Sequence, residues 1–316
     1  MDLSIICVNW NSADYLLSCL SSVAEFTHGI EYEVIVVDNA SSPQDIEKLS
    51  RAAATMRLIL SPENIGFAQA NNAGFQASTG AYVLLLNPDT ELIGPAITTM
   101  LEKIRTLPDA GIVGCKLLNT DRTVQLSSIQ KSPTILNQVF DAEYLLLRWP
   151  NCPLWRLGPL FSDQTEPVSV DAISGACMLM KREVFEQVGM FSQDYFMYAE
   201  DLDLNYKVKR TGRSNYYVGA ATMIHHGGKS SGRQGLSHWA TIMKYTAMLR
   251  YYRNTRGRLY ELLYRAAMGC AAAGRVIALS ILYPFADRTA LRGALKKWVT
   301  ILGWAVGRHT AAAQGR

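Results

Sequence analysis

Three acidic side chains stand close together in the segment Glu200-Asp201-Leu202-Asp203, directly after the apolar run Phe196-Met197-Tyr198. Acids are common at the start of a helix, because the free N–H groups and the helix dipole stabilise negative charge there. The large apolar residues before the cluster predict in addition that the carboxylates enter a partly desolvated pocket. A carboxylate in such a pocket is placed to take the proton from an alcohol that attacks the anomeric carbon of a sugar.

A further acid, Asp89, follows the apolar run Tyr82–Leu86 and a proline, so we expect its carboxylate to be fixed at a sheet edge. A fixed hard anion suits Mg²⁺ or Mn²⁺ that bridges to a diphosphate. His225, at the end of another predicted strand, is a candidate second ligand, and imidazole favours Mn²⁺ somewhat over Mg²⁺. Two ligands alone are a weak signal, and a pair such as His225-His226 is more often structural or on the surface.

Segments rich in Asn, Asp and Ser follow four predicted strands. These segments are Asn9-Trp10-Asn11, Asp38-Asn39-Ala40-Ser41, Asn64-Ile65-Gly66-Phe67 and Asn87-Pro88-Asp89-Thr90. Each one alone fits an ordinary turn or helix N-cap. Four in succession on one edge of a sheet instead predict a crevice of amide and carboxylate groups, suited to a base, a ribose and, through a cation, a diphosphate.

Strand-like and helix-like segments alternate through the N-terminal part of the chain. Continuous apolar strands between such helices predict an α/β fold with a mostly parallel, Rossmann-like sheet flanked by helices, which binds ligands at the carboxyl ends of its strands. The expected strands are Leu3–Val8, Glu33–Val37, Arg57–Leu60, Tyr82–Leu86 and Gly111–Leu117, and the expected helices are Ala13–Phe26, Pro43–Ala54, Phe67–Ala77 and Pro95–Leu107.

Residues 129–168 break this alternation with five prolines. We predict an irregular insertion there that serves as a lid or an acceptor-facing loop. Regular structure is expected to resume in Val168–Lys181, followed by a helix from the acidic cluster to Thr211-Gly212. A strand over Tyr216–Ile224 then ends at His225-His226-Gly227-Gly228.

The formal net charge of +4 is unevenly distributed. Residues 239–316 hold 13 Lys and Arg against two acids, a net charge of +11, whereas residues 1–238 hold 18 against 25, a net charge of −7. The tail contains a basic amphipathic pattern, which is typical of peripheral contact with an anionic membrane; a helical cap packed on the core is the alternative. The apolar face of this pattern comprises Leu295, Trp298, Val299, Leu302 and Val306, with Lys296, Lys297 and Arg308 beside it.

The composition, 49% hydrophobic and 18% charged, excludes a disordered chain. We predict two parts, a catalytic domain over residues 1–238 and a basic helical region over residues 239–316. Six cysteines without a CxxC pair or a secretory leader are expected to be reduced and mostly buried in a cytoplasmic protein. No uninterrupted apolar run reaches about 18 residues, and Arg275 interrupts the nearest, Ala266–Tyr283, so no segment is expected to span a bilayer. The cationic tail predicts peripheral contact with the inner face of the plasma membrane.

An ordered series of motifs resembles the inverting family 2 glycosyltransferases of the GT-A fold, and within them the bacterial rhamnosyltransferase-like branch. The resemblance covers about residues 3–235. The motifs are Val8-Asn9-Trp10-Asn11, Val36-Val37-Asp38-Asn39-Ala40-Ser41, Asn64-Ile65-Gly66-Phe67, Asn71-Asn72-Ala73-Gly74, Leu86-Asn87-Pro88-Asp89, Ser174-Gly175-Ala176, Glu200-Asp201-Leu202-Asp203 and His225-His226-Gly227-Gly228.

The resemblance implies roles for individual residues. Asp38 corresponds to the residue that contacts the pyrimidine base. Asn39 follows it, and the stretch of Val8, Asn9 and Asn11 corresponds to residues beside the base. Asn64, Gly66 and Asn71 correspond to the segment near the ribose and diphosphate. Asn87-Pro88-Asp89 stands where the family has D-x-D, so Asp89 corresponds to the metal-binding acid, while Asn87 departs from the first acid.

The same resemblance identifies Asp201 with the catalytic base and Glu200 with its neighbour, which positions the acceptor. His225 corresponds to a ligand of the metal or a contact to the diphosphate, with His226 as second choice. The implied donor is a nucleoside-diphosphate sugar, first dTDP-rhamnose and second a UDP-sugar.

The implied acceptor is a glycan or a lipid-linked sugar in cell-surface polysaccharide synthesis. Two alternatives are a sugar-1-phosphate nucleotidyltransferase and a non-catalytic, membrane-docked binding subunit. Nucleic acid is not the expected partner of the tail.

Overall fold

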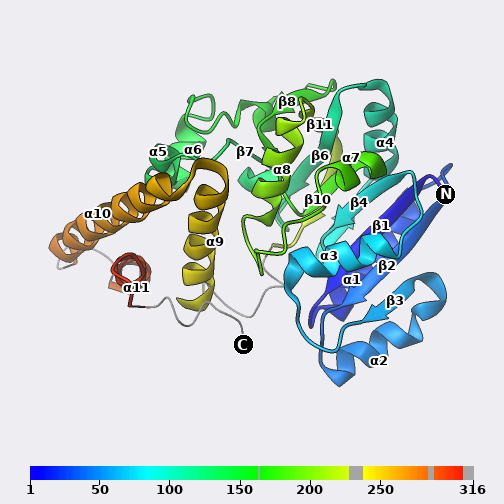
Figure 1. The fold of residues 1–316 in the computed structure, drawn as a ribbon, viewed down its shortest axis with the longest axis horizontal. Helices are drawn as coiled ribbons and strands as arrows, with labels where there is room; N and C mark the ends of the chain where they lie inside the picture. Colours follow the sequence, from blue (N-terminus) through cyan, green and yellow to red (C-terminus); the bar gives the residue numbers. More distant parts are fainter. Residues whose placement is uncertain (163, 228–237, 284–287, 309–316) are drawn as a thin grey trace. The chain divides into compact units, whose positions relative to one another are not determined.

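The computed structural model describes residues 1–162, 164–227, 238–283 and 288–308 (Figure 1). The chain divides into two compact units. Unit 1 comprises residues 1–132, 149–196 and 200–233, and unit 2 comprises residues 133–148, 197–199 and 234–316. By sequence, unit 2 contains 14 Lys and Arg against four acids, a net charge of +10, and unit 1 contains 17 against 23, a net charge of −6.

Four parallel strands form one half of the main sheet of unit 1. They lie in the order β3 (Arg57–Leu60), β2 (Tyr32–Asp38), β1 (Leu3–Asn9), β4 (Tyr82–Leu86). All four therefore end at the same edge, as the sequence predicted. The register pairs Asn9 with Asp38 across β1 and β2, which places these two polar residues side by side.

The other half of the sheet is mixed. Strand β10 (Cys177–Lys181) runs antiparallel between β4 and β6 (Ala110–Leu118), and β11 (Ser214–His225) runs parallel to β6. Two short strands, β5 (Thr90–Leu92) and β8 (Val168–Val170), pair antiparallel with β11. Because His225 is opposite Thr90 in the β5–β11 pair, the end of β11 lies beside the turn that carries Asp89. Strands β7 (Ile129–Gln130) and β9 (Ala172–Ile173) form a separate two-stranded sheet.

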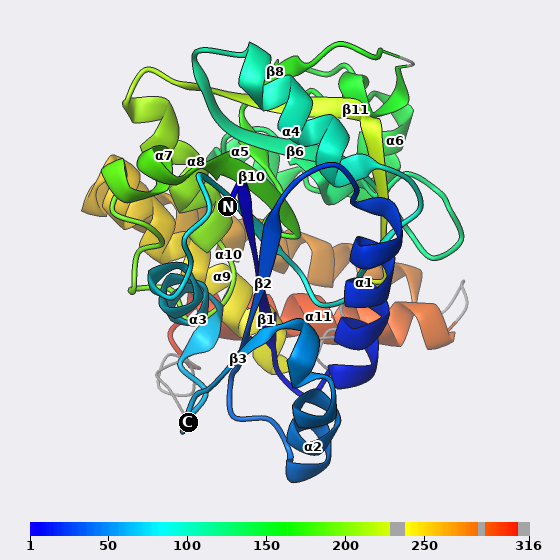
Figure 2. The ribbon, with the colours of Figure 1, turned by 90° about the vertical axis from the view of Figure 1, so that its right-hand side faces the viewer.

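Helices cover both faces of the sheet, and α1 and α3 lie on opposite faces (Figure 2). Alternate residues of β1 point to the two sides, because side chains alternate along a strand. Ile6 faces α3, where it lies against Gly74, while Leu3, Ile5 and Cys7 join α1 and α4 in the core. The helices are α1 (Ala13–Phe26), α2 (Pro43–Arg51), α3 (Gly66–Gln76), α4 (Ala96–Thr106), α7 (Arg182–Gln187) and α8 (Glu200–Arg210), with short 3₁₀ helices at Ala53–Thr55, Leu126–Ser128 and Gly158–Phe161.

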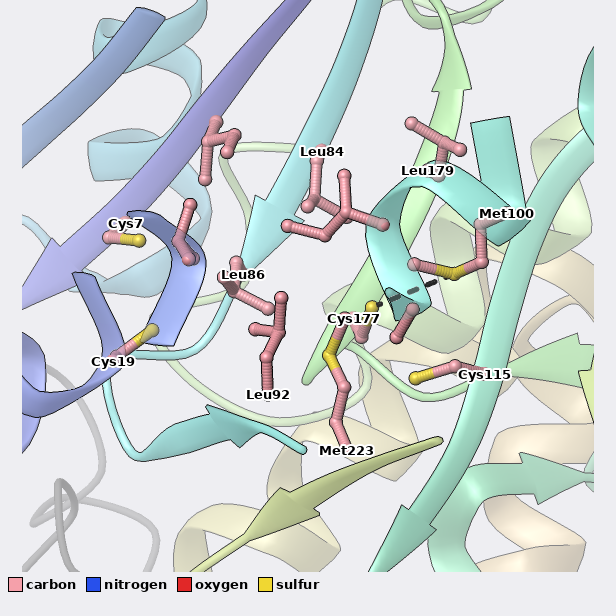
Figure 3. Close-up of a cluster of buried hydrophobic side chains, with 14 of the residues drawn as sticks. Cys7, Cys19, Leu84, Leu86, Leu92, Met100, Cys115, Cys177, Leu179 and Met223 are labelled. Atoms are coloured by element: carbon pink, nitrogen blue, oxygen red, sulfur yellow. Dashed lines mark hydrogen bonds between the residues drawn. The ribbon is translucent and has the colours of Figure 1, made fainter. Parts of the chain in front are cut away.

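The core of unit 1 contains four of the six cysteines. Cys7, Cys19, Cys115 and Cys177 are buried among leucines of β4 and β10, and Cys177 contacts Met100 of α4 (Figure 3). All six cysteines are free thiols, with Cys270 exposed. The expectation that most of the cysteines are buried is thus confirmed.

The segment 129–168, which we expected to be irregular, contains two helices, α5 (Ile135–Val139) and α6 (Glu143–Arg148), besides β7 and a 3₁₀ turn. Thr134 begins α5 with a capping box, in which its hydroxyl accepts from Asn137 N–H and Asn137 accepts from Thr134 N–H. Residues 133–148 belong to unit 2 rather than unit 1. Four of the five prolines thus lie between short regular elements, and Pro159 lies in the first turn of the 3₁₀ helix Gly158–Phe161.

Unit 2 is built mainly from α9 (His238–Arg256), α10 (Arg258–Leu282) and α11 (Arg288–Ala305). Gly257, with φ +85°, makes the sharp corner between α9 and α10 (Figure 1). The aromatic residues of the tail form the core of this unit, since the Tyr252 ring packs on Tyr260 and Tyr264, and Tyr264 packs on the buried Trp304. Tyr251, Tyr252, Tyr264 and Trp304 are therefore buried inside unit 2, whereas Trp239 is exposed.

Helix α11 shows only part of the expected apolar face. Val299 and Val306 are exposed, whereas Leu295, Trp298 and Leu302 are half-buried. Within the described chain, one helix, α10, is long and apolar enough to cross a membrane, by length and composition alone. The sequence analysis had discounted this segment because of Arg275, whose guanidinium donates to the Val139 carbonyl within unit 2.

The contact between α3 and the sheet leads to a prediction. A Cβ at Gly74 would lie 2.6 Å from the Ile6 Cγ2 methyl, so Gly74→Ala forces α3 away from the sheet. We expect a loss of about 1–3 kcal/mol of stability, measured by urea unfolding followed through tryptophan fluorescence. The control is Gly94→Ala, where nothing lies within 4 Å of the added Cβ. Equal unfolding midpoints for the two variants would contradict the packing described.

Candidate active site

Asp38 ends β2 with a fully buried carboxylate whose two oxygens are both engaged. Oδ1 accepts from Asn9 Nδ2 at 2.8 Å, and Oδ2 accepts from the backbone N–H of Ser41 at 3.0 Å. The Asn9 amide also donates to the Ser41 hydroxyl at 3.0 Å. The structure thus brings the predicted base-contacting residues Asn9 and Asp38 together and fixes their orientation.

The next residues along these strands complete the same corner. Asn11 (φ 53°) and Ala40 (φ 59°) both adopt the left-handed backbone conformation, which turns the chain sharply after β1 and β2. Asn11 Oδ1 accepts from Ser42 N–H at 2.8 Å, and Asn11 N–H donates to the Ser41 hydroxyl at 2.9 Å. Val8 is buried and shares a small apolar cluster with Val37, so its side chain belongs to the core.

A second group of predicted residues forms a network of asparagines. Asn39 Nδ2 donates to Asn64 Oδ1 at 2.8 Å, and Asn39 Oδ1 accepts from Ile65 N–H at 2.9 Å. Asn64 Oδ1 also accepts from Gly66 N–H at 3.0 Å. Asn71 is buried one turn into α3, where its amide donates to the Phe67 carbonyl. The loop after β3 is therefore tied to the loop after β2.

Gly66 begins α3 at a position that requires glycine. Its φ is +81°, and a Cβ there would lie 2.5 Å from the Phe196 carbonyl oxygen, which itself accepts from Phe67 N–H at 2.9 Å. The start of α3 is thus in contact with the segment that leads to the acidic cluster.

Asp89 and His225 lie side by side. Asp89 Oδ1 is 3.3 Å from His225 Nε2, and the Asp89 side chain has no exposed surface. The Asn87 amide is also 3.3 Å from His225 Nε2. Pro88 is buried in the turn between these two residues. The two predicted metal ligands are therefore adjacent, with Asn87 beside them in place of an acid.

Gln125 determines which nitrogen of His225 carries the proton. His225 Nδ1 is 2.7 Å from Gln125 Oε1, an oxygen that only accepts, while the Gln125 amide donates to Asn119 and to the His225 carbonyl. With the proton on Nδ1, the neutral imidazole presents its Nε2 lone pair toward Asp89, which is the form that a metal-binding histidine has. Gln125 could not be predicted from the sequence, because a lone Gln far along the chain from the histidine stands in no motif.

His226 belongs to a different contact. Its Nε2 is 3.1 Å from Glu91 Oε2 and its Nδ1 is 3.1 Å from the Thr120 hydroxyl. These contacts favour His225, the first choice, over His226. Gly228, the last residue of the motif, lies outside the described residues.

The metal-binding chemistry of this corner is partial. Within the described residues, no group of three His, Cys, Asp and Glu side chains is placed to hold a metal ion. A buried carboxylate and an imidazole nitrogen 3.3 Å apart fit two positions in the shell of Mn²⁺ or Mg²⁺. Oxygens of a diphosphate would supply further positions.

Asp201 is held by two backbone N–H groups at the start of α8. Oδ2 accepts from Gly175 N–H at 3.0 Å, and Oδ1 accepts from its neighbour Leu202 N–H at 2.8 Å. Burial nevertheless raises the pKa of the Asp201 carboxyl, and the two N–H donors oppose this effect. The result is an oriented carboxylate that is a stronger base than an exposed aspartate.

Glu200, the neighbouring acid, is buried in a different way. Its pKa is raised to about 8, first by burial and second by the charge of Asp201. Among the described residues, its Oε2 has no hydrogen-bond partner. At neutral pH Glu200 is thus a protonated carboxyl able to donate a hydrogen bond. The two residues before it, Tyr198 (φ 71°) and Ala199 (φ 63°), are both in the left-handed region, which costs energy for side chains of this kind.

The turn Ser174-Gly175-Ala176 connects the acid to the metal corner. Gly175 N–H donates to Asp201, and the Ala176 carbonyl accepts from Asn87 N–H at 2.9 Å. Asn205, one turn further along α8, accepts from Ile173 N–H and donates to the carbonyls of Ile173 and Asp201. Asn205 therefore fixes the start of α8 to the strand before this turn, a role that the sequence pattern did not reveal.

Residues 4–189 match the family described as Glycosyl transferase family 2. The match covers more than half of the chain, so the protein belongs to glycosyltransferase family 2. Members of this family are inverting glycosyltransferases. The GT-A resemblance of the motif series is thus confirmed.

Two bacterial relatives are rhamnosyltransferases. An N-acetylglucosaminyl-diphospho-decaprenol L-rhamnosyltransferase of Mycobacterium tuberculosis is 29% identical over 257 residues, which cover 77% of this chain and 82% of that protein. Rhamnosyltransferase WbbL of Escherichia coli is 26% identical over 230 residues, 70% of this chain and 82% of that protein. A low-salt glycan biosynthesis hexosyltransferase of Haloferax volcanii, Agl10, is 31% identical over 230 residues, 71% of this chain and 66% of that protein.

Solved structures share the fold at low sequence identity. The mannosyltransferase PcManGT from Pyrobaculum calidifontis, in complex with GDP-Man and Mn²⁺, superposes with a TM-score of 0.58 at 17% identity, covering 98% of this chain and 87% of that chain. GalNAc-T7 with UDP, GalNAc and Mn²⁺ superposes with a TM-score of 0.61 at 15% identity, covering 99% of this chain and 57% of that chain.

The contact of Gln125 with His225 leads to a prediction about metal affinity. Gln125→Ala removes the acceptor that fixes the imidazole, so Mn²⁺ affinity in the presence of nucleotide should fall about 10-fold or more. Electron paramagnetic resonance of free Mn²⁺ measures this directly. The control Gln130→Ala, on β7, should leave the affinity unchanged. Equal affinities for Gln125→Ala and the wild type would contradict the role of Gln125 in holding His225 for the metal.

The burial of Glu200 leads to a prediction about stability and pH. Folded Glu200, with a pKa of about 8 against 4.5 ordinarily, keeps a proton that the unfolded chain releases. The free energy of unfolding should therefore fall as the pH rises from about 4.5 to 8, by up to about 1.4 kcal/mol per pH unit from this group. Glu200→Gln should remove this part of the slope in urea unfolding measured across the range. Parallel stability curves for variant and wild type would contradict the assignment.

Proposed function

We propose that this glycosyltransferase moves rhamnose from a nucleoside-diphosphate sugar to a hydroxyl of a glycan or lipid-linked acceptor, with inversion at the anomeric carbon. The observation that carries this proposal is the buried Asp201 carboxylate, oriented by two N–H groups on a turn that also hydrogen-bonds Asn87 beside Asp89 and His225. A base and a diphosphate-binding corner joined by one short turn suit a displacement at a carbon between them.

The proposed reaction is a single in-line displacement. Asp201 takes the proton from the acceptor hydroxyl while the hydroxyl oxygen forms a bond to the anomeric carbon. The bond from that carbon to the diphosphate oxygen breaks, and its electron pair leaves with the nucleoside diphosphate. Asp201 then returns its proton to solvent. Because the oxygen attacks opposite to the leaving group, the configuration at the anomeric carbon is inverted.

Asp89 and His225 would hold the divalent metal. When bound, Mn²⁺ or Mg²⁺ neutralises charge that develops on the departing diphosphate. Asn87 donates to His225 where the family motif has an acid, so this chain offers one negative charge fewer to the metal. Asp38 and Asn9 would bind the base, and the network of Asn39, Asn64 and Gly66 would lie near the ribose and diphosphate.

The names of the bacterial relatives support the choice of rhamnose and of a lipid-linked acceptor. Two of them are called rhamnosyltransferases, and the mycobacterial one is named for a decaprenyl-diphosphate-linked sugar. We therefore propose dTDP-rhamnose as the donor, with a UDP-sugar as the alternative. Family membership removes the support for a sugar-1-phosphate nucleotidyltransferase.

We further propose that the protein is cytoplasmic and bound peripherally to the inner face of the plasma membrane. A lipid-linked acceptor would be presented at that surface. The net charge of +10 on unit 2 supports attraction to anionic lipid.

Replacing the proposed base tests the mechanism. Asp201→Asn keeps the shape of the side chain but removes its basicity, so transfer should fall by about 10²–10⁴-fold. Binding of the donor, measured by isothermal titration, should change little. The matched control Asp194→Asn changes an acid a few residues before α8. A transfer rate of Asp201→Asn close to that of the wild type would rule out Asp201 as the base.

Replacing the proposed metal ligand tests the donor site. Asp89→Ala should abolish the Mn²⁺-dependent part of nucleotide binding, because it removes the buried carboxylate of the metal corner.

A panel of nucleotide sugars with Mn²⁺ and Mg²⁺, scored by thermal shift, identifies the donor, since a ligand of the native state raises its apparent stability. The wild type should respond most to dTDP-rhamnose. If EDTA leaves both binding and turnover unchanged, the metal has no part in the reaction.

A further inference from the structure

Helix α10 presents an apolar face to the outside of unit 2. From Leu259 to Leu282, the exposed positions carry no charged side chain, and Ser280 is the sole polar one. Six large side chains on this face are each at least 52% exposed. They are Leu259, Leu262, Leu263, Ile277, Ile281 and Leu282. A stripe from residue 259 to 281 is about 33 Å long at 1.5 Å per residue.

The charges of α10 within this span lie on its other side. Arg265 donates to the carbonyls of Ala305 and Trp304, and Arg275 donates to the carbonyl of Val139. Glu261 pairs with Arg253 of α9 at 3.1 Å. An ordinary surface helix faces water with its charges, whereas α10 keeps the charged side chains of this span on the side that also buries Tyr264, Met268 and Ala272.

Unit 2, which carries this face, is positively charged. In the described part of unit 2, ten exposed Lys and Arg side chains stand against two exposed acids, Asp141 and Glu143. Two of the cations, Arg292 and Lys296 of α11, line a pocket of about 490 Å³ together with Leu295 and Val299. Cations beside apolar side chains fit the phosphate and the acyl chain of an anionic lipid.

We infer that the apolar face of α10 docks unit 2 on an anionic lipid bilayer, with the helix lying in the plane of the membrane surface. This inference rests on the proposed peripheral location and assigns it to a surface. A second copy of the chain is a poorer occupant, because two units that each carry a net charge of +10 repel one another.

The contacts of the charged side decide against a spanning helix. To cross the bilayer, α10 would have to detach Arg265 and Arg275 from the carbonyls that they bind. It would also have to withdraw the buried Tyr264, Met268 and Ala272 from the core of unit 2. An in-plane helix keeps all of these contacts and buries only the face that is already exposed.

The test is vesicle flotation with the full chain. Wild type should bind vesicles of phosphatidylcholine with phosphatidylglycerol and bind phosphatidylcholine alone much more weakly. Leu263→Gln combined with Ile277→Gln should lower the partition coefficient about tenfold or more, since each side chain loses its transfer from water to lipid. The control Leu60→Gln alters a comparably exposed leucine of unit 1 and should bind as the wild type does.

Binding of the double variant equal to that of the wild type would overturn the inference. So would a lipid-free dimer of the wild type that the double variant abolishes, since the face would then belong to a second copy. Resistance of the membrane-bound protein to alkaline carbonate would overturn the in-plane arrangement.

Nucleotide-sugar binding, measured by thermal shift on the same lipid-free samples, separates this inference from the proposed function. Both variants should bind the donor as the wild type does. Loss of vesicle binding with intact donor binding would confirm that the α10 face acts independently of the donor site. If the wild type itself binds no nucleotide sugar, the proposed function fails, while the vesicle result still decides the role of α10.

Discussion

The hydrogen bond from Gly175 N–H to the Asp201 carboxylate is the contact on which the site depends. It fixes the proposed base to a turn whose next residue, Ala176, accepts from Asn87 at the start of the metal corner. A buried carboxylate without such donors would take up a proton and lose its basicity. For Glu200, burial and the charge of Asp201 outweigh the hydrogen bond to its own backbone N–H, and its pKa is raised to about 8. Burial thus raises the pKa of both adjacent acids, and the N–H groups of Gly175 and Leu202 oppose this effect at Asp201.

Much of this arrangement could be predicted from the sequence. The β-branched runs gave the four parallel strands nearly to the residue, and the polar residues after them proved to be hydrogen-bonded neighbours, as with Asn9 and Asp38. The antiparallel direction of β10 beside β4 and β6, and of β5 beside β11, could not be predicted from the sequence, because strand direction depends on the path of the connections. Gln125 and Asn205 were missed for a related reason. Each acts on a residue far away in the chain, His225 and Ile173, and neither stands in a local pattern.

The sequence of the basic tail predicted an exposed apolar helix face but placed it on the wrong helix. Its amphipathic pattern suggested a lipid interface in the last helix, yet only part of that apolar face is exposed, and Tyr252, Tyr264 and Trp304 of the tail are buried in the core of unit 2. Its apolar exposed face belongs to α10, where Arg275 seemed to interrupt the pattern. The arginine lies on the side of the helix that faces the protein, so the exposed side is free of charge. A helical pattern has to be resolved by face before its charges can be interpreted.

In the proposed mechanism, Asp201 and the Asp89–His225 corner act on opposite sides of the same anomeric carbon. A crystal structure with Mn²⁺ and a non-hydrolysable nucleotide sugar tests this claim most directly. We expect the nucleotide base at Asp38 and the diphosphate and metal at Asp89 and His225. The Asp201 carboxylate should face the anomeric carbon from the side opposite the diphosphate. A sugar bound with Asp201 on the same side as the diphosphate, or with another acid at the opposite face, would contradict it.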